Sequence, residues 1–326
     1  MSYNLKEART FDEQLALLES RGMLIDDSIA AIKTLQQTNY YRFTGYSYLF
    51  QKANNKYHKD IHFENIVKIM EFDSKLRRVL LGTLEYIEIC ARTQIAYWFS
   101  HNHGKDGGAY YDAANFKNVE HHEEMISHLD KQIEKNAAQS FVAHHKQKYA
   151  GKMPLWCAVE LMSFSSLSKL YNNMHSDDKT LIAAHLEMDS SFLSNWLHCF
   201  SVLRNTCAHY GRLYSICYSP PVILGGPTLR KYPEIQIDTL FAYIIAMLRF
   251  ISKSSHKEEL QDAICALIDE YSDYIDISTG LGFPPNWKTL LFDQNLTELK
   301  PVDPKKKQLT NKENDHLERT TAETQA

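Results

Sequence analysis

An arginine and a histidine five positions apart provide the clearest chemical signal in this chain. They are Arg204 and His209, and Asn205 directly follows the arginine. Histidine exchanges protons near neutral pH, whereas arginine offers a permanent charge and a planar fork of donors that matches a phosphate. RNA carries its own nucleophile, the 2′-hydroxyl, so a site of this type can cleave RNA without a metal ion. We therefore consider His209 a general acid or base, Arg204 an electrostatic stabiliser and Asn205 a group that orients either of them.

These residues lie at the end of a predicted helix. Paired serines, Ser190 and Ser191, offer an N-cap, the apolar residues Phe192, Trp196, Leu197, Phe200 and Leu203 follow at helical spacing, and Gly211 is a natural stop. At about 100° per residue, Asn205 and His209 share a face, but Arg204 lies roughly 140° from His209. A single helix therefore cannot easily direct Arg204 and His209 at one atom, whereas two copies that meet across a twofold axis can.

The spacing Arg-x4-His is typical of the HEPN ribonucleases, and the longer segment Leu203–Tyr214 (LRNTCAHYGRLY) resembles the signature of the Abi family, abortive-infection proteins of the AbiD/AbiF type. Further blocks resemble the same family: an aromatic run at 40–50, the run EICART that contains Glu88 and Arg92, the segment 154–171, for which we predict one helix with Pro154 near its first turn, and the segment 282–287. The resemblance as a whole covers roughly residues 10 to 295 and is strongest at 203–214.

The resemblance implies an all-α, HEPN-like helical bundle that acts in antiphage defence as a metal-independent endoribonuclease and toxin. Attack by the 2′-hydroxyl would leave 2′,3′-cyclic phosphate ends. The resemblance also implies a homodimer, because HEPN ribonucleases usually build one site from two motifs and this chain has one good copy. Members of the family can be paired with an antitoxin, either a small RNA or a protein. Catalysis is assigned to Arg204, His209 and Asn205, and RNA binding to Arg212, Arg92, Glu88, Tyr210, Tyr214 and Arg42.

Three other interpretations remain open at this stage. A helix C-terminus favours cationic side chains through its dipole alone, so the motif need not be catalytic. A HEPN-like domain can also bind RNA or a partner protein without cutting. A cysteine hydrolase that uses Cys207 is the third interpretation; on a helix, however, Cys207 and His209 point away from each other.

The composition of the chain restricts these hypotheses. The chain has 326 residues, of which 44% are hydrophobic and 23% charged, and a net charge of −4, so a nucleic-acid surface would have to be a local patch. Six scattered cysteines without a Cys-x-x-Cys pair indicate reduced thiols. We expect a soluble, cytoplasmic protein, since no signal peptide or membrane span is evident.

The order of the predicted elements suggests three parts: an N-terminal helical and aromatic segment (1–55), a helical domain (56–299) and a disordered, polar tail (300–326). Thr10–Glu13 forms a capping box before a first helix, and Asp26 and Asp27 precede a second. The aromatic run at 40–50 contains Arg42 and either stacks on unpaired bases or packs the helical hairpin onto the bundle.

The longest apolar stripe predicts one helix from about residue 63 to 100. In it, Glu88 and Arg92 form either a solvated ion pair or part of the catalytic groove. The His-rich region 101–145 raises the question of metal binding, but no spaced ligand pair is present, and residues 120–148 look like an exposed helical lid. We therefore expect no metal and no cofactor.

Overall fold

The computed structural model describes residues 6–299 and confirms the all-α prediction. Over this range it contains sixteen α-helices and three short 3-10 helices and no β-strand. The α-helices are α1 (Phe11–Ser20), α2 (Ser28–Gln37), α3 (Tyr40–Ser47), α4 (Phe63–Asn102), α5 (Val119–Lys135), α6 (Ser140–Tyr149), α7 (Leu155–Leu161), α8 (Phe164–Asn173), α9 (Ser176–His185), α10 (Ser190–Ala208), α11 (Gly226–Lys231), α12 (Leu240–Phe250), α13 (His256–Glu270), α14 (Ile277–Leu281), α15 (Trp287–Phe292) and α16 (Gln294–Thr297). The predicted tail at 300–326 lies outside the described residues.

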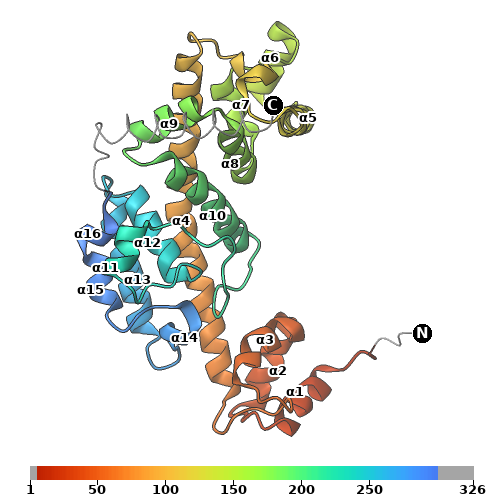
Figure 1. Ribbon diagram of the computed structural model, residues 1–326. Coiled ribbons are helices and arrows are strands. Elements are labelled where there is room, and N and C mark those ends of the chain that lie inside the picture. Colours follow the sequence, from red (N-terminus) through yellow and green to blue (C-terminus); the bar gives the residue numbers. More distant parts are fainter. Residues whose placement is uncertain (1–5, 300–326) are drawn as a thin grey trace, which may run out of the picture.

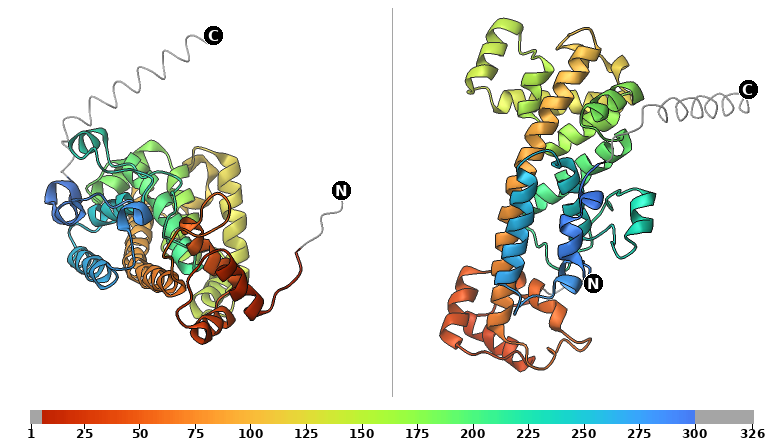
Figure 2. Two further views of the ribbon diagram at one scale, coloured as in Figure 1. Left: turned by 90° about the horizontal axis from the view of Figure 1, so that it is seen from below. Right: turned by 90° about the vertical axis from the view of Figure 1, so that its left-hand side faces the viewer.

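Helix α4 is the axis of the molecule. It has 40 residues, which corresponds to a length of about 60 Å. Its predicted apolar stripe is buried from Ile66 to Ile95 and partly buried at Trp98. Helices pack on it at every level: α3 near its start, α10, α12 and α13 along its middle, and α7 and α9 near its end. Figures 1 and 2 show the other helices arranged around this long orange helix.

The N-terminal helices begin where the sequence predicts. Thr10 and Glu13 form a reciprocal capping box at the start of α1, and the Asp27 carboxylate caps α2. Helix α3 then packs on the first turns of α4, where the rings of Phe43 and Phe63 stack with their centroids 4.3 Å apart. This contact crosses the predicted boundary between residues 55 and 56, so the N-terminal segment packs directly on the axis of the bundle.

Helix α10 lies against α4 and α8 and carries the Arg-x4-His motif. Its predicted apolar face is buried, including Trp196, Phe200 and Leu203. Two details of its ends differ from prediction. The Asp189 carboxylate, rather than a serine, is the N-cap. The left-handed residue after the helix is Tyr210, with φ of 59°, rather than Gly211.

The segment predicted as one helix after Pro154 is divided into α7 and α8. Met162 is extended, and the Ser163 side chain accepts a hydrogen bond from the Ser166 N–H and so starts a new helix. The predicted lid corresponds to α5 and α6, and α5 packs on α7 and α8. None of the helices in residues 6–299 combines the length and the apolar character that a membrane span requires.

Candidate active site at the end of helix α10

Glu88 holds Arg204 in place. The Glu88 side chain is buried on α4, with its Oε2 atom 3.3 Å from Arg204 Nε and its Oε1 atom 2.5 Å from Arg92 Nη2. Arg92 also donates to the carbonyl of Val159 and, at 2.8 Å, to that of Met162, where α7 ends. The predicted Glu88–Arg92 pair is thus present, and it is largely buried rather than solvated. One carboxylate therefore links the guanidinium groups of α4 and α10 with the end of α7.

Arg204 retains an exposed surface in spite of these contacts. Its side chain is 35% exposed, and its Nη1 donates to Asn205 Oδ1 at 3.3 Å. Arg204 also lines a cavity of about 770 Å³, which we call the Arg204 cavity. An anchored guanidinium with a free side is suited to bind a phosphate, because little conformational entropy is lost on binding.

The Arg204 cavity lies between α5, α8 and α10. Its wall combines apolar side chains with hydroxyl, amide, imidazole and charged groups. The lining residues are Arg92, Phe116, His121, Glu124, Met125, His128, Leu129, Gln132, Leu161, Met162, Ser163, Ser165, Ser166, Ser168, Lys169, Leu170, Asn172, Asn173, His198 and Arg204. Sequence reasoning did not find this cavity, since it depends on how α5 lies over α8.

His209 is the C-cap of α10, and its side chain is exposed. It is not among the residues that line the Arg204 cavity. Arg204 and His209 of one chain therefore lie on different surfaces, as the angle of roughly 140° between them on a helix predicts. Behind His209 the chain turns tightly: the Gly211 N–H donates to the Thr206 carbonyl at 2.7 Å, and a Cβ at Gly211 would lie only 2.9 Å from that oxygen. Glycine is needed here for this close approach rather than for a left-handed backbone.

A buried ion pair that the sequence analysis missed fixes the segment behind the motif. Asp73 on α4 accepts hydrogen bonds from the Tyr46 hydroxyl at 2.6 Å and from the backbone N–H groups of Leu213 and Tyr214 at 3.1 and 2.9 Å. Arg77 pairs with Asp73 and donates to the Gly211 carbonyl at 3.1 Å. Burial raises the pKa of Asp73, and these donors oppose that shift. The signal in the sequence was two opposite charges four residues apart inside the apolar stripe of α4.

The residues predicted to bind RNA fall into three groups. Arg42 and Tyr210 are exposed and available. Arg92 and Glu88 belong to the cluster around Arg204. Arg212 donates to the Gly45 carbonyl and lies 5.8 Å from the centre of the Tyr46 ring, so it ties the motif segment to α3.

Tyr214 has a packing role. Only 3% of this residue is exposed, and its hydroxyl donates to the Asp276 carbonyl and accepts from the Asp276 N–H, both at 3.0 Å. Its ring leaves so little space that a Cβ at Gly280 would lie 2.2 Å from it. Tyr214 in this conformation therefore has no free face for a base.

The aromatic run at 40–50 is partly buried and partly exposed. Phe43 and Tyr46 are buried and hold α3 on α4, whereas Tyr41 and Tyr48 are 75% and 68% exposed. Arg42 lies on the exposed side as well. The run thus packs the hairpin on the bundle and also presents an aromatic, basic surface.

The geometry argues against a cysteine nucleophile. All six cysteines are free, but Cys207 is only 1% exposed. Burial raises the pKa of the Cys207 thiol to about 12. At neutral pH the group is therefore a neutral thiol without access to a substrate, whereas nucleophilic cysteines need an accessible thiolate.

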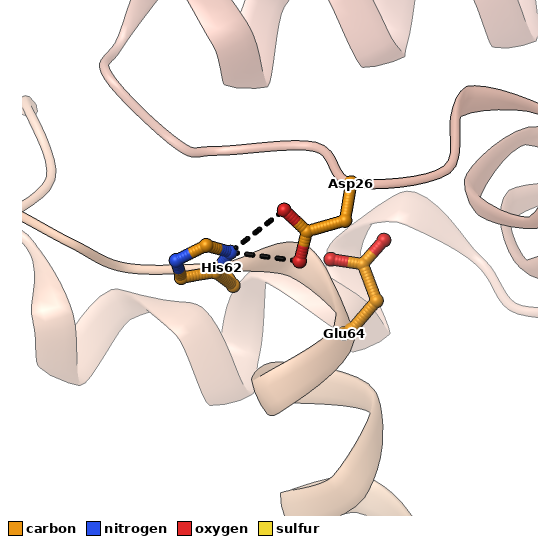
Figure 3. A group of neighbouring side chains, drawn as sticks. All are labelled: Asp26, His62 and Glu64. Carbon is orange, nitrogen blue, oxygen red and sulfur yellow. Dashed lines mark hydrogen bonds and ion pairs between the residues drawn. The ribbon is translucent and has the colours of Figure 1, made fainter.

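One cluster has the composition of a metal site. In the described part of the chain, the ligand atoms of Asp26, His62 and Glu64 lie within 4.8 Å of one another (Figure 3). His62 Nδ1 is 2.8 and 2.9 Å from the two Asp26 oxygens, and the Asp27 N–H donates to Glu64. These bonds connect the loop before α2 to the start of α4. The cluster is separated from Arg92 by 28 residues of α4, or roughly 40 Å, so it is remote from the Arg204 cavity.

The fold and the site define a class: an all-α protein in which a helix carrying Arg-x4-His contributes its arginine to a cavity of mixed apolar and polar lining and is held by a buried carboxylate on a long central helix. The chain belongs to the family described as Abi-like protein, whose model matches residues 33–215, more than half of its length. The match begins in α2 and ends just after Tyr214, so it includes Glu88, Arg204 and His209. A search of curated proteins and a search of solved structures each found no match.

Proposed function

We propose that this protein is an abortive-infection endoribonuclease that cleaves RNA without a metal ion, with Arg204 and His209 in its active site. Membership of the Abi-like family supports a role in abortive infection. The observation that carries the enzymatic proposal is the state of Arg204: buried Glu88 fixes the guanidinium, which nevertheless remains 35% exposed on a helix that ends in an exposed His209. A side chain held in this way stabilises developing charge without reorganising.

The chemistry needs only groups that the RNA and the chain supply. The 2′-oxygen attacks the adjacent phosphorus while a base accepts the proton of the 2′-hydroxyl. As the new P–O bond forms, the bond from phosphorus to the 5′-oxygen breaks, and an acid protonates that oxygen. The products are a 2′,3′-cyclic phosphate and a free 5′-hydroxyl. His209 makes one of these two proton transfers and a solvent water molecule makes the other, while Arg204 stabilises the charge on the phosphorane.

The orientation of the motif residues supports a homodimer. In one chain Arg204 lines the cavity and His209 does not, and five residues of helix separate them by about 7.5 Å along the axis. In the proposed dimer the α10 helices of two copies face each other, so that His209 of one copy approaches the phosphate held by Arg204 of the other.

The test is incubation of purified wild-type, Arg204→Ala and His209→Ala proteins with total RNA in excess EDTA, followed by analysis of the RNA ends. We expect cleavage by the wild type alone, with cyclic phosphate ends. Equal cleavage by all three proteins would remove the motif from the mechanism. In cells, we expect the wild type to reduce phage yield or growth and His209→Ala to do neither.

The alternative function is an RNA-binding module that does not cut. The exposed Tyr210, Arg42 and Tyr41 favour it, because aromatic and arginine side chains bind unpaired bases. The two functions differ in the behaviour of His209→Ala. For an enzyme, this variant binds RNA but does not cleave it. For a binding module, the wild type and the variant both bind RNA, and neither produces new ends.

A further inference from the structure

The Arg204 cavity has the size and the lining of a site for one small molecule with apolar, hydrogen-bonding and charged parts. Its volume of about 770 Å³ falls within the usual range of pockets that enclose a small ligand. Phe116, Met125, Leu129 and Leu170 supply an apolar surface, and Gln132 and Asn172 supply amide groups. A wall that combines apolar side chains with amide groups suits a nucleobase, whose faces are apolar and whose edges form hydrogen bonds.

The cationic side of the cavity suits a phosphate. Arg204 and Lys169 both line it, and Lys169 is exposed. The first turn of α8, with Ser165 and Ser166, forms part of the same wall, and a helix N-terminus attracts anions. Glu124 is the acidic lining residue, and a carboxylate can accept a hydrogen bond from the amino group of a base.

Histidines complete the wall. His121 and His128 come from α5 and His198 from α10, and all three side chains are exposed. Imidazole rings stack on unpaired bases. A paired base within a duplex could not enter a cavity of this size, because it would bring its partner strand with it.

We propose that the Arg204 cavity binds one unpaired nucleotide of the RNA, next to the bond that is cut. This inference rests on the proposed ribonuclease function and specifies its substrate: RNA that is single-stranded at the cleavage site, with its base inserted between α5 and α8 and its phosphate on Arg204 and Lys169. The cavity would thereby select which nucleotide lies beside the scissile bond.

Binding is measured first, by calorimetric titration of wild-type protein and of His209→Ala with each of the four nucleoside 5′-monophosphates, with a nucleoside and with inorganic phosphate. We expect the two proteins to bind monophosphates equally, at least one of them better than the nucleoside or phosphate alone. Lys169→Ala should weaken monophosphate binding about tenfold and leave nucleoside binding unchanged, and Lys135→Ala, an exposed lysine outside the cavity, should change neither.

A second variant fills the cavity. Ser165→Trp places a large ring in it, whereas Ser191→Trp places the same ring on an exposed position of α10 outside it. We expect Ser165→Trp to lose monophosphate binding and to cleave a hairpin RNA at least tenfold more slowly, and Ser191→Trp to behave as wild type. If Ser165→Trp does not fold, as judged by circular dichroism, the effect of Lys169→Ala on monophosphate binding decides whether the nucleotide binds in the cavity.

The outcomes separate this inference from the proposed function. If the protein binds monophosphates in the cavity but does not cleave RNA, the nucleotide site stands and the ribonuclease proposal fails. If it cleaves paired and unpaired RNA equally and Ser165→Trp has wild-type activity, the ribonuclease proposal stands and the nucleotide site is wrong. Absence of monophosphate binding by both wild type and His209→Ala also overturns the inference.

Discussion

Glu88 is the residue on which the geometry of the site depends most. Its carboxylate is shared by Arg92 and Arg204, and only 6% of the residue is exposed. Removal of one partner from a buried ionic cluster leaves the other charges uncompensated. Arg92 would keep its two carbonyl acceptors, but Arg204 would lose the contact that fixes it to α4.

We expect Glu88→Gln to lower cleavage by roughly a hundredfold, because small displacements of a catalytic group are costly. It should also lower the free energy of unfolding by about 3 kcal/mol. The measurements are single-turnover cleavage and urea unfolding. Glu85→Gln, on the exposed side of the same helix, is the matched control. Unchanged cleavage by Glu88→Gln would show that Arg204 needs no such anchor.

Tyr210 combines an unfavourable backbone with an exposed ring. Its φ of 59° lies in the left-handed region, which costs a residue other than glycine about 1 kcal/mol. This backbone closes the end of α10, where the Gly211 N–H donates to the Thr206 carbonyl. The residue is 71% exposed, so its ring has no packing role and is accessible to RNA.

For Tyr210→Gly we expect stability equal to wild type or about 1 kcal/mol higher. RNA binding should be weaker by about 1–3 kcal/mol through the loss of base stacking. Thermal unfolding and fluorescence anisotropy with a single-stranded RNA measure the two effects. Tyr210→Phe keeps the ring and should bind as wild type. If Tyr210→Gly binds RNA normally, the ring has no part in recognition.

The raised pKa of Cys207 leads to a prediction about thiol reagents. A thiol with a pKa of about 12 is almost fully protonated at pH 8, and Cys207 is buried as well. We expect iodoacetamide at pH 8 to label the exposed Cys217 and to leave Cys207 unmodified and RNA cleavage intact. Mass spectrometry of the digested protein identifies the labelled site, and Cys217→Ser is the control. Loss of activity in Cys217→Ser on alkylation would reopen the cysteine mechanism.

Helices α3, α4 and the segment after α10 are joined through Asp73. The donors to this carboxylate come from all three elements: Tyr46, Arg77 and the backbone of Leu213 and Tyr214. These hydrogen bonds to α4 therefore fix the turn that follows His209. The position of the histidine thus depends on Asp73, which lies 136 positions earlier in the chain.

Burial raises the pKa of the Asp73 carboxyl group. The folded protein therefore binds a proton at Asp73 more tightly than the unfolded chain does. Its contribution to stability is fully present below the unfolded pKa of about 3.9 and is lost as pH rises through the raised folded value. Asp73→Asn should remove this part of the pH dependence. It should also destabilise the protein by about 3 kcal/mol at neutral pH, because Arg77 loses its partner.

Urea unfolding of wild type and Asp73→Asn between pH 3 and 8 measures both effects, and the difference between the two curves isolates Asp73. Glu71→Gln, at an exposed position of the same helix, should follow the wild-type curve. Parallel curves for wild type and Asp73→Asn would mean that Asp73 has the same pKa in the folded and unfolded states.

Local signals in the sequence predicted the helices well. The capping box at Thr10, the Asp27 cap and the long stripe of α4 are decided by nearest neighbours along the chain, and all appear as expected. The division between α7 and α8 was missed because the Ser163 cap competes with an apolar run that continues past it. The Arg204 cavity and the Asp73 cluster depend on residues distant in sequence, and helical periodicity gives no information on which helices meet.

At the scale of the whole molecule, the candidate site is formed entirely by the part of the chain that matches the Abi-like family. Residues 33–215, which match the Abi-like family, supply α3 to α10 and thus both walls of the Arg204 cavity. Helices α12 and α13 lie outside the match and pack against α4. No residue of α12 or α13 lines the cavity, so these helices affect the site only through the helices of the matched region on which they pack, which are α4 and, for α12, also α10.

The homodimer is the prediction that concerns the assembled molecule. If Arg204 of one copy works with His209 of the other, a mixture of Arg204→Ala and His209→Ala chains forms dimers in which one site has both groups intact. Co-expression of the two variants with different tags should therefore restore cleavage to about a quarter of the wild-type level, since half of the dimers are mixed and each has one intact site of two. Sedimentation should show a dimer. A monomer that cleaves RNA, or mixed dimers without activity, would place both residues of a working site on one chain.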